Sequence, residues 1–132
     1  MLVLPIMNPK NKKWLLDLAK KAIETKLTGK EFKLDSVDIP KKFKIRKACF
    51  VTLKYNNRLR GCVGHLLPTQ PLYQDVINSA RAAAFEDYRF KPLVADELEQ
   101  IQIEISILEK PQQFQYYKPE ELLNFLAVNK PG

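Results

Sequence analysis

The residue types best suited to chemistry gather between Arg58 and His65, which is the only histidine of the chain. Cys62 is the candidate nucleophile, because nearby positive charge or a base can lower a thiol's pKa and yield the reactive thiolate. Arg60 precedes it by two residues, so in a regular strand both side chains share a face. His65 would lie on the opposite face unless a bulge at Gly64 turned the backbone. The alternative is a small buried cysteine that packs beneath a helix.

Two glycines, Gly61 and Gly64, bracket Cys62 within a segment of β-strand character. Glycine weakens a strand interior and usually marks a bulge or a close approach to the backbone. The two glycines would leave room either for a substrate against the strand or for a closely packed helix. Both interpretations stay open at this point, and both place this strand at the centre of the candidate site.

Asp87 and Arg89 form a second candidate cluster, in a loop that follows the predicted second helix. An arginine there could hold a carboxylate or a phosphate through its two-pronged donor geometry. The alternative is a local ion pair that orders the loop. Glu104 lies on the polar face of a later strand, where it could pair with Arg60 or act as a general base. We expect these residues and the glycine-bracketed strand to line one cleft.

Metal and cofactor sites are not indicated by the sequence. One histidine and two cysteines without paired spacing argue against zinc, so we predict no metal. A P-loop, a dinucleotide-binding fingerprint, a zinc-protease helix motif and a nucleophile-elbow serine motif are all absent, and we predict no cofactor.

The two cysteines are predicted to be free thiols. A two-residue turn at Asn56–Asn57 would set Val51 opposite Cys62, with Cys49 diagonal to Cys62 on the same face. Such diagonal neighbours lie about 7–8 Å apart, which exceeds the usual reach of a disulfide.

Periodic patterns predict three helices, near residues 9–28, 71–85 and 119–126. The first opens with Asn8-Pro9, a capping side chain before proline at the first helical position, and then shows apolar residues at helical spacing. The second is rich in alanine, which lets a helix lie close to a sheet. The third opens with proline and two acids, in the positions that suit a first turn.

Strand patterns complete the expected fold. A hairpin over residues 48–64 turns at two asparagines, and residues 101–108 place isoleucine at every second position. The order of helix, hairpin, helix, strand and helix predicts an α+β domain. Its antiparallel or mixed sheet contains the 48–64 hairpin and the 101–108 strand, with the helices packed on it.

Charge is spread unevenly along the chain. The net charge of +7 divides into +11 for residues 1–60 and −4 for residues 61–132. Such asymmetry indicates either a solvated lysine surface or an acidic or nucleic-acid partner, for which Lys41, Lys42 and Lys44 are the candidate contacts. Nucleic-acid binding is therefore an alternative function, although too few aromatics lie among these cations for a base-stacking platform.

The amino-acid sequence also shows no pattern typical of a membrane span or a signal peptide. No apolar run approaches the roughly 20 residues that span a bilayer, and the apolar start of the chain lacks the basic and small residues of a signal peptide. We therefore expect a protein of the cytoplasm, or of the cytoplasm and nucleus in a eukaryote, without a membrane partner.

Several motifs resemble one known family. Leu59–Gly64 (LRGCVG) resembles the LRGCIG signature of the AMMECR-type domain family, and Phe50–Leu53 looks like the strand that leads into it. Ala82–Leu93 is similar to the family run AAFxDPRFxPL, with Tyr88 in place of the usual proline. Glu97–Ser106 resembles the run ELxxIxIEIS. These motifs occur at family spacing.

The resemblance implies a single AMMECR-type domain over residues 1–132 that lacks the usual C-terminal part of the family. It leaves the biochemical function open. We expect a module that binds a small ligand or a protein in a cleft around the signature, with Arg60, Gly61, Gly64, Asp87, Arg89 and Glu104 as binding residues. Family context also implies a pathway shared with Memo-type and radical S-adenosylmethionine proteins. The alternative is an enzyme that uses Cys62 as its nucleophile, with Arg60 lowering its pKa and Glu104 or His65 as the base.

Overall fold

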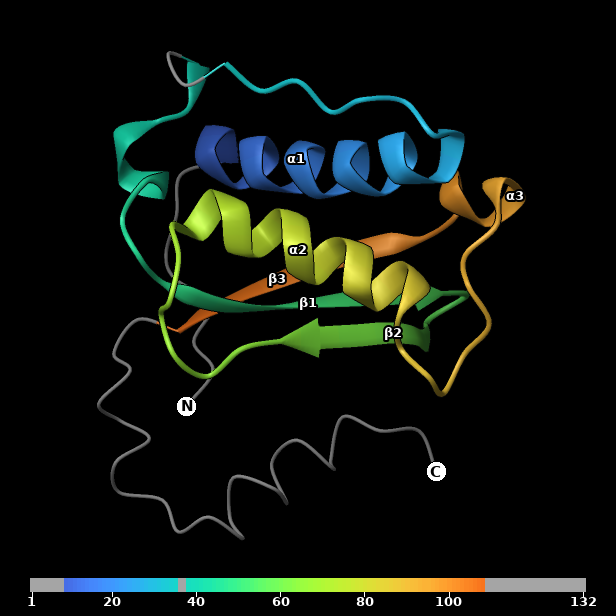
Figure 1. Cartoon of the computed structure of the whole chain (residues 1–132). Helices are drawn as coiled ribbons and strands as arrows, with labels where there is room; N and C mark the ends of the chain where they lie inside the picture. Colours follow the sequence, from blue (N-terminus) through green and yellow to red (C-terminus); the bar gives the residue numbers. More distant parts are fainter. Residues whose placement is uncertain (1–8, 36–37, 109–132) are drawn as a thin grey trace, which may run out of the picture.

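Helices cover one face of a small sheet in this α+β fold (Figure 1). The structure is a computed structural model that describes residues 9–35 and 38–108. The elements in chain order are α1 (Pro9–Thr28), η2 (Lys41–Phe43), β1 (Ala48–Tyr55), β2 (Arg58–Gly64), α2 (Leu72–Phe85), α3 (Ala95–Leu98) and β3 (Gln102–Leu108). The first two predicted helices, the hairpin and the later strand are confirmed. The predicted helix 119–126 lies outside the described residues.

The sheet has the order β2-β1-β3, and both strand pairs are antiparallel. Of the two sheet types predicted, the described strands therefore form the antiparallel one. The hairpin turns at Asn56 and Asn57, both of which have positive φ angles (52° and 63°). This is the left-handed backbone that a tight two-residue hairpin needs and that asparagine tolerates.

A bulge in β2 changes the register that the sequence predicted. Lys54 faces Leu59 but Leu53 faces Gly61, so Arg60 is the extra residue. Cys62 therefore faces Thr52, and the predicted pairing with Val51 is wrong.

The two thiols consequently lie on opposite faces of the sheet. Cys49 packs into the main core between helices and sheet, whereas Cys62 packs against a smaller cluster on the other face. Both are free cysteines, as predicted.

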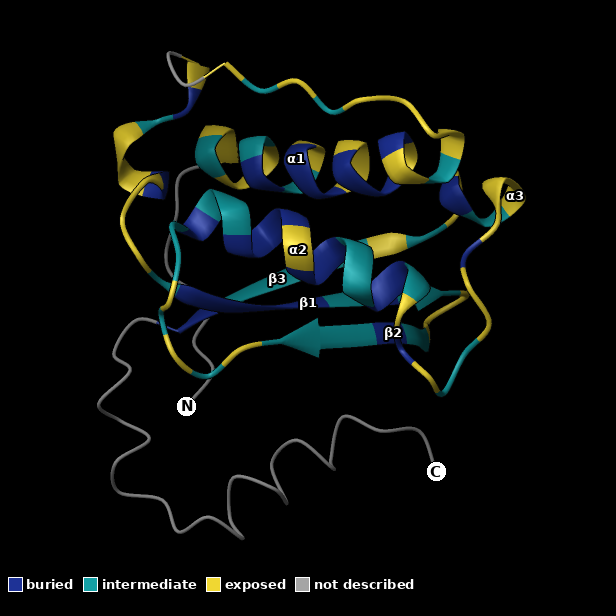
Figure 2. Cartoon of the chain, viewed as in Figure 1, coloured by how far each residue is buried: buried dark blue, intermediate teal, exposed yellow. Residues whose placement is uncertain are grey.

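The main core lies between the sheet and the two long helices (Figure 2). Its sheet side comes from alternate residues of the central strand β1, which are fully buried: Cys49, Val51 and Leu53. Its helix side combines bulky residues of α1 with the alanines of α2, of which Ala80, Ala83 and Ala84 are at most 2% exposed. Small side chains on α2 bring its backbone close to the sheet, and this sets the position of everything that follows the helix.

Gly61 is the point of closest approach between α2 and the signature strand β2. A Cβ atom added there would lie 2.1 Å from the carbonyl oxygen of Ala83. The obstacle is helix backbone, which cannot rotate away as a side chain can. Of the two interpretations of this glycine, the structure supports the packed helix: the space beside Gly61 is already filled.

We expect Gly61→Ala to destabilise the fold by about 3 kcal/mol, the upper range for overpacking a core. The free energy of unfolding, measured by urea denaturation, checks this. Adding Ala83→Gly should not restore stability, because the obstacle is a carbonyl oxygen and not the Ala83 methyl group. Rescue by the double substitution would contradict the geometry described here.

Candidate functional site

Asp87 joins the loop after α2 to the outer edge of β2. The loop of residues 86–94 descends from the end of α2 along this edge and rises again to α3 (Figure 1). Within it, Oδ2 of Asp87 accepts the backbone N–H of Cys62 at 3.1 Å. β2 lies at the edge of the described sheet, and this N–H is directed to the carboxylate and not to β1. The side chain of Asp87 thus accepts a hydrogen bond from an edge-strand N–H, as a neighbouring strand would do in the interior of a sheet.

Arg89 neutralises the same carboxylate. Its Nε donates to Oδ1 of Asp87 at 2.9 Å, and its Nη2 donates to Oδ2 at 2.7 Å. The backbone N–H of Arg89 adds a contact to Oδ1 at 3.2 Å. Planar guanidinium and planar carboxylate therefore meet in two parallel hydrogen bonds, the strongest geometry for such a pair. Both side chains are largely buried, at 4% exposure for Asp87 and 14% for Arg89.

The pKa of Asp87 reflects opposing effects. Burial alone would raise it, but hydrogen bonds from the Arg89 side chain, the Cys62 amide and the Arg89 amide outweigh burial and leave the pKa below its ordinary value. The pKa of Arg89 is raised in turn, chiefly by its hydrogen bonds to Asp87. Both groups are therefore charged at neutral pH, and neither is poised to transfer a proton.

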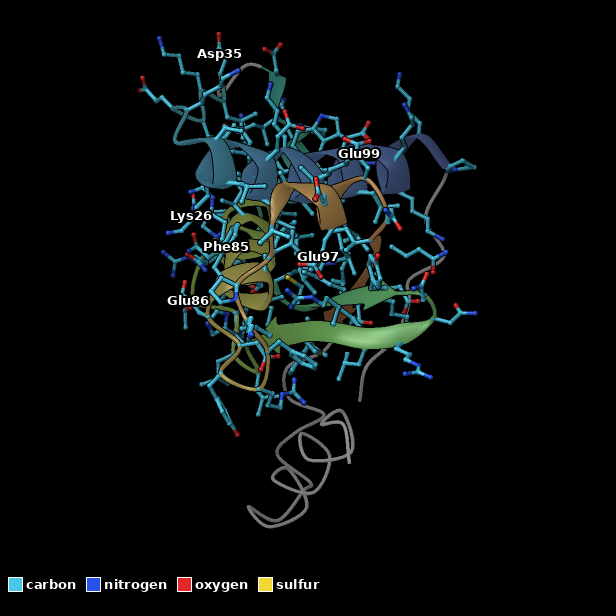
Figure 3. All side chains as sticks on the ribbon, turned by 90° about the vertical axis from the view of Figure 1, so that its right-hand side faces the viewer. Lys26, Asp35, Phe85, Glu86, Glu97 and Glu99 are labelled. Carbon is cyan, nitrogen blue, oxygen red and sulfur yellow. The ribbon has the colours of Figure 1, made fainter. Side chains whose placement is uncertain are left out.

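Arg60 forms a second pair of the same kind with Glu97 of α3. Its Nε donates to Oε2 at 2.7 Å and its Nη2 to Oε1 at 3.0 Å, while Nη2 also donates to the Lys91 carbonyl oxygen. Figure 3 shows Glu97 on the side of α3 that faces β2, with Glu99 on the opposite side. The hydrogen bonds from Arg60 lower the pKa of Glu97, so this carboxylate is charged at neutral pH.

The predicted partnership of Arg60 with Glu104 is wrong. Glu104 pairs with Lys54 across β1 and β3, at 3.0 Å between Nζ and Oε2, and both side chains are substantially exposed. The strand order explains the difference, because β1 lies between β2 and β3 and so separates Arg60 from Glu104. Arg60 contacts Glu97 and the loop, not the Cys62 thiol.

Phe90 links the two pairs. The guanidinium carbons of Arg60 and Arg89 lie 5.8 Å and 5.4 Å from the centre of its ring. Both distances are within the range of cation–π attraction. The two ion pairs and the ring thus form one connected frame around β2, made of Arg60, Asp87, Arg89, Phe90 and Glu97.

The Cys62 thiol lies on the face of the sheet opposite the helices, and it is partly exposed. The prediction of a cysteine packed beneath a helix is therefore wrong. Its hydrogen-bond partner among the described side chains is the hydroxyl of Thr52, at 3.3 Å. A threonine hydroxyl does not accept a proton near neutral pH, so the described contacts supply the thiol with a neighbour but not with a base.

His65 is held away from this thiol by Asp75 on the first turn of α2. Its Nδ1 lies 2.9 Å from Oδ1 of Asp75, and its backbone N–H donates to the Cys49 carbonyl oxygen. The strand has no bulge at Gly64 that would turn His65 toward Cys62, since the register is regular from Leu53 to Phe50 on the partner strand. Gly64 is instead required by packing, because a Cβ atom there would meet Phe50 and the Cys49 carbonyl.

Asp75 also binds Cys49, the second cysteine, through hydrogen bonds. Its Oδ2 accepts the N–H and the Sγ–H of Cys49 at 2.9 Å and 3.2 Å, and its Oδ1 accepts a hydrogen bond from Gln70. Burial, followed by the charge of Asp75, raises the pKa of Cys49 far above its ordinary value. The Cys49 thiol is therefore inert in the folded chain.

Sequence reasoning missed Asp75, Phe90 and the role of Glu97. Asp75 had a usable signal, because it is the charged residue on the largely apolar face of the helix that contains Leu72, Val76 and Ala80. A charge at such a position needs buried partners. Glu97 and Phe90 had no comparable signal, since their contacts depend on how the loop after α2 folds back.

Residues 9–35 and 38–108 contain no group of three His, Cys, Asp or Glu side chains placed to hold a metal ion. Across the same ranges, no helix has both the length and the apolar character needed to cross a membrane.

Comparison with known proteins identifies a family and several relatives. The family model AMMECR1 matches residues 16–132. A protein from Nanoarchaeum equitans is 36% identical over 119 residues, and one from Saccharolobus islandicus is 38% identical over 128 residues. These matches cover 89% and 91% of this chain but only 66% and 54% of the relatives. The chain thus spans less than two thirds of the length of these curated relatives.

A solved structure agrees with the fold. The crystal structure of an uncharacterised protein from Pyrococcus horikoshii superposes with a TM-score of 0.66 at 34% identity. The superposition covers 76% of this chain and 55% of that chain.

We expect Asp87→Asn to reduce the free energy of unfolding by about 2 kcal/mol at pH 7, because it removes charged hydrogen bonds to Arg89. The folded pKa of Asp87 lies below its unfolded value of about 3.9. Its stabilising effect is therefore present above that pH and is lost as pH falls through the folded pKa.

The difference between wild type and Asp87→Asn should accordingly shrink below about pH 4, in denaturation curves measured from pH 7 to acid. Asp17→Asn is the matched control, because Asp17 forms an exposed pair with Lys13; its effect should stay below about 0.5 kcal/mol. A difference for Asp87→Asn that grows toward acid would contradict the assignment.

Proposed function

The chain belongs to the AMMECR1 family, and from this premise we propose that it is a binding module whose contact surface surrounds the signature strand β2. The partner we propose is a segment of another protein. The observation that carries the proposal is that the Asp87 carboxylate accepts hydrogen bonds from both the Cys62 amide and the Arg89 guanidinium. This carboxylate fixes strand and loop relative to each other before any partner arrives, and a surface ordered in advance loses less entropy on binding.

The charged residues of the site support this interpretation, because they pair with one another. Arg60, Asp87, Arg89 and Glu97 form two bidentate pairs with one another, and Nη1 of Arg60 is buried without a hydrogen-bond partner among the described residues. A partner that drew one of them away would leave a largely buried charge unpaired, which is costly. We infer that these residues shape the binding surface, while the partner contacts the groups beside them.

Tyr88 is the foremost of those contact groups. It lies between Asp87 and Arg89 in the loop, yet its side chain is directed to solvent and the residue is 82% exposed. An exposed tyrosine on a well-anchored loop is a typical hot spot of a protein interface. Small-molecule sites are concave and enclose their ligand, so this protruding aromatic favours a protein segment. The partly exposed Cys62 thiol and its neighbour Thr52 extend the surface onto the sheet.

The alternative function, nucleophilic catalysis by Cys62, receives less support from the described contacts. The two proposed bases have other partners: His65 binds Asp75, and Glu104 binds Lys54. The proposed activating cation, Arg60, binds Glu97. A thiol that presents a surface group to a partner needs none of these, so the geometry favours binding.

The test is selection of peptide binders from a phage-displayed random library on the whole chain, followed by fluorescence anisotropy of labelled peptides. Tyr88→Ala should weaken binding about tenfold, the loss expected for an interface hot spot. Leu67→Ala is the matched control, since Leu67 is also an exposed apolar residue (64%) but belongs to the segment between β2 and α2. Figure 1 shows this segment at the end of the molecule opposite the loop of residues 86–94. A purified Memo-type protein, the partner implied by the family resemblance, is tested with the same variants.

Alkylation of Cys62 separates binding from catalysis. Cys49 is fully buried, so a thiol reagent added to the folded chain reports on Cys62. Bound peptide should slow this reaction, and Cys62→Ser should keep its affinity within about threefold, less than 1 kcal/mol. Peptides that bind without protecting Cys62 and without needing Tyr88 would contradict the proposal. A covalent peptide–Cys62 adduct seen by mass spectrometry would favour the enzyme.

A further inference from the structure

We propose a second docking surface, on the turn of residues 41–46, for an acidic protein segment that carries an aliphatic residue. This basic turn has the sequence Lys-Lys-Phe-Lys-Ile-Arg and no acidic residue. It comprises η2 and the three residues after it, and in Figure 1 it lies at the end of the molecule opposite α3. The surface is thus remote from the loop that carries Tyr88.

The cations of the basic turn are exposed, and among the described residues no acidic side chain pairs with them. None of Lys41, Lys42, Lys44 and Arg46 forms an ion pair within the part of the chain that the structure describes, and all four are exposed. Four like charges over six residues repel one another. A partner with negative charges would relieve this repulsion, which is the charge complementarity that directs association.

The backbone of the turn is firmly anchored, unlike that of a flexible basic tail. Phe43 is 2% exposed and stacks on Trp14 of α1, with ring centres 5.3 Å apart. The N–H of Leu72 donates to the Ile45 carbonyl oxygen at 2.9 Å, and Arg46 forms a bridge with the residue before α2. The lysines therefore project from a fixed frame, so ordering the turn costs little when a partner binds.

Ile45 decides the class of partner. It lies between Lys44 and Arg46 with 58% of its surface exposed, so it is an apolar contact within a basic surface. A single-stranded nucleic acid would use the cations for its phosphates but would stack its bases on aromatic rings, and the aromatic of this turn, Phe43, is buried. An acidic polypeptide with an aliphatic side chain matches both the charges and Ile45.

The test compares two fluorescein-labelled peptides by anisotropy at physiological salt, where charges are screened beyond about 8 Å. One peptide has two glutamates on each side of a leucine, and the other has serine in place of leucine. The leucine peptide should bind about fivefold tighter, as expected for partial burial of an aliphatic side chain. Ile45→Ser should abolish this preference without weakening the serine peptide.

Charge reversal locates the surface. Lys42→Glu combined with Lys44→Glu should weaken both peptides at least about tenfold. Lys26→Glu combined with Lys30→Glu is the matched control, because it makes the same change in net charge at the far end of α1, about 30 Å away for a helix of this length. It should alter affinity less than about threefold. Equal losses in both double variants, or no binding by wild type, would overturn the proposal.

A single-stranded oligonucleotide of matched charge tests the competing class of partner. If it binds more tightly than the leucine peptide, and if Ile45→Ser leaves that binding unchanged, the surface recognises phosphates and the proposal is wrong. Tyr88→Ala should leave the acidic peptides unaffected, because the two surfaces lie at opposite ends of the molecule. The two proposals can therefore fail independently.

Discussion

The architecture of the site depends on one carboxylate. Asp87 accepts the backbone N–H of Cys62 and two side-chain donors of Arg89, and it does so at the outer edge of β2. Without it, the edge of the sheet would present an unpaired N–H to solvent, and the loop after α2 would lose its attachment to the strand. The position of Asp87 follows from Gly61, which lets α2 approach β2 so closely that the residues after the helix reach the strand edge.

From this attachment the remaining contacts follow. Arg89 is required to neutralise a buried carboxylate, and its guanidinium then lies against Phe90. The loop continues past Lys91 to α3, where Glu97 binds the arginine that the β2 bulge directs toward it. The result is a strand whose charged neighbours are occupied with one another. Such a site is suited to holding a shape and presenting Tyr88 and Cys62, more than to moving protons.

Patterns of local origin were predictable from the sequence, while contacts made by folded loops were not. The two-residue turn at Asn56–Asn57 and the alternating isoleucines of β3 follow from backbone conformation and strand periodicity. The bulge at Arg60 could not be recognised in the amino-acid sequence, because a single extra residue does not change the composition of a short strand. The bulge nevertheless directs the Arg60 side chain away from Cys62. It also places the Cys49 and Cys62 thiols on opposite faces of the sheet, where the sequence predicted the same face.

Ion-pair partners were the least predictable part of the site. The choice of Glu97 over Glu104 for Arg60 depends on the path of the loop, which the sequence specifies only through long-range packing. The resemblance to a family supplied the fold and drew attention to the strand β2, around which the two ion pairs lie. It could not separate residues that hold the strand in place from residues exposed to solvent, whereas burial and hydrogen bonding in the structure make that distinction.

Hydrogen exchange at the Cys62 amide tests the central claim most directly. This N–H lies at the edge of the described sheet, so its protection in native-state exchange depends on Asp87. We predict slow exchange in the wild type, comparable with amides of the central strand β1. In Asp87→Ala the Cys62 amide should exchange at least about tenfold faster while the β1 amides stay protected, as expected for local loss of one charged hydrogen bond. Rapid exchange in the wild type, or an unchanged rate in the variant, would contradict the account.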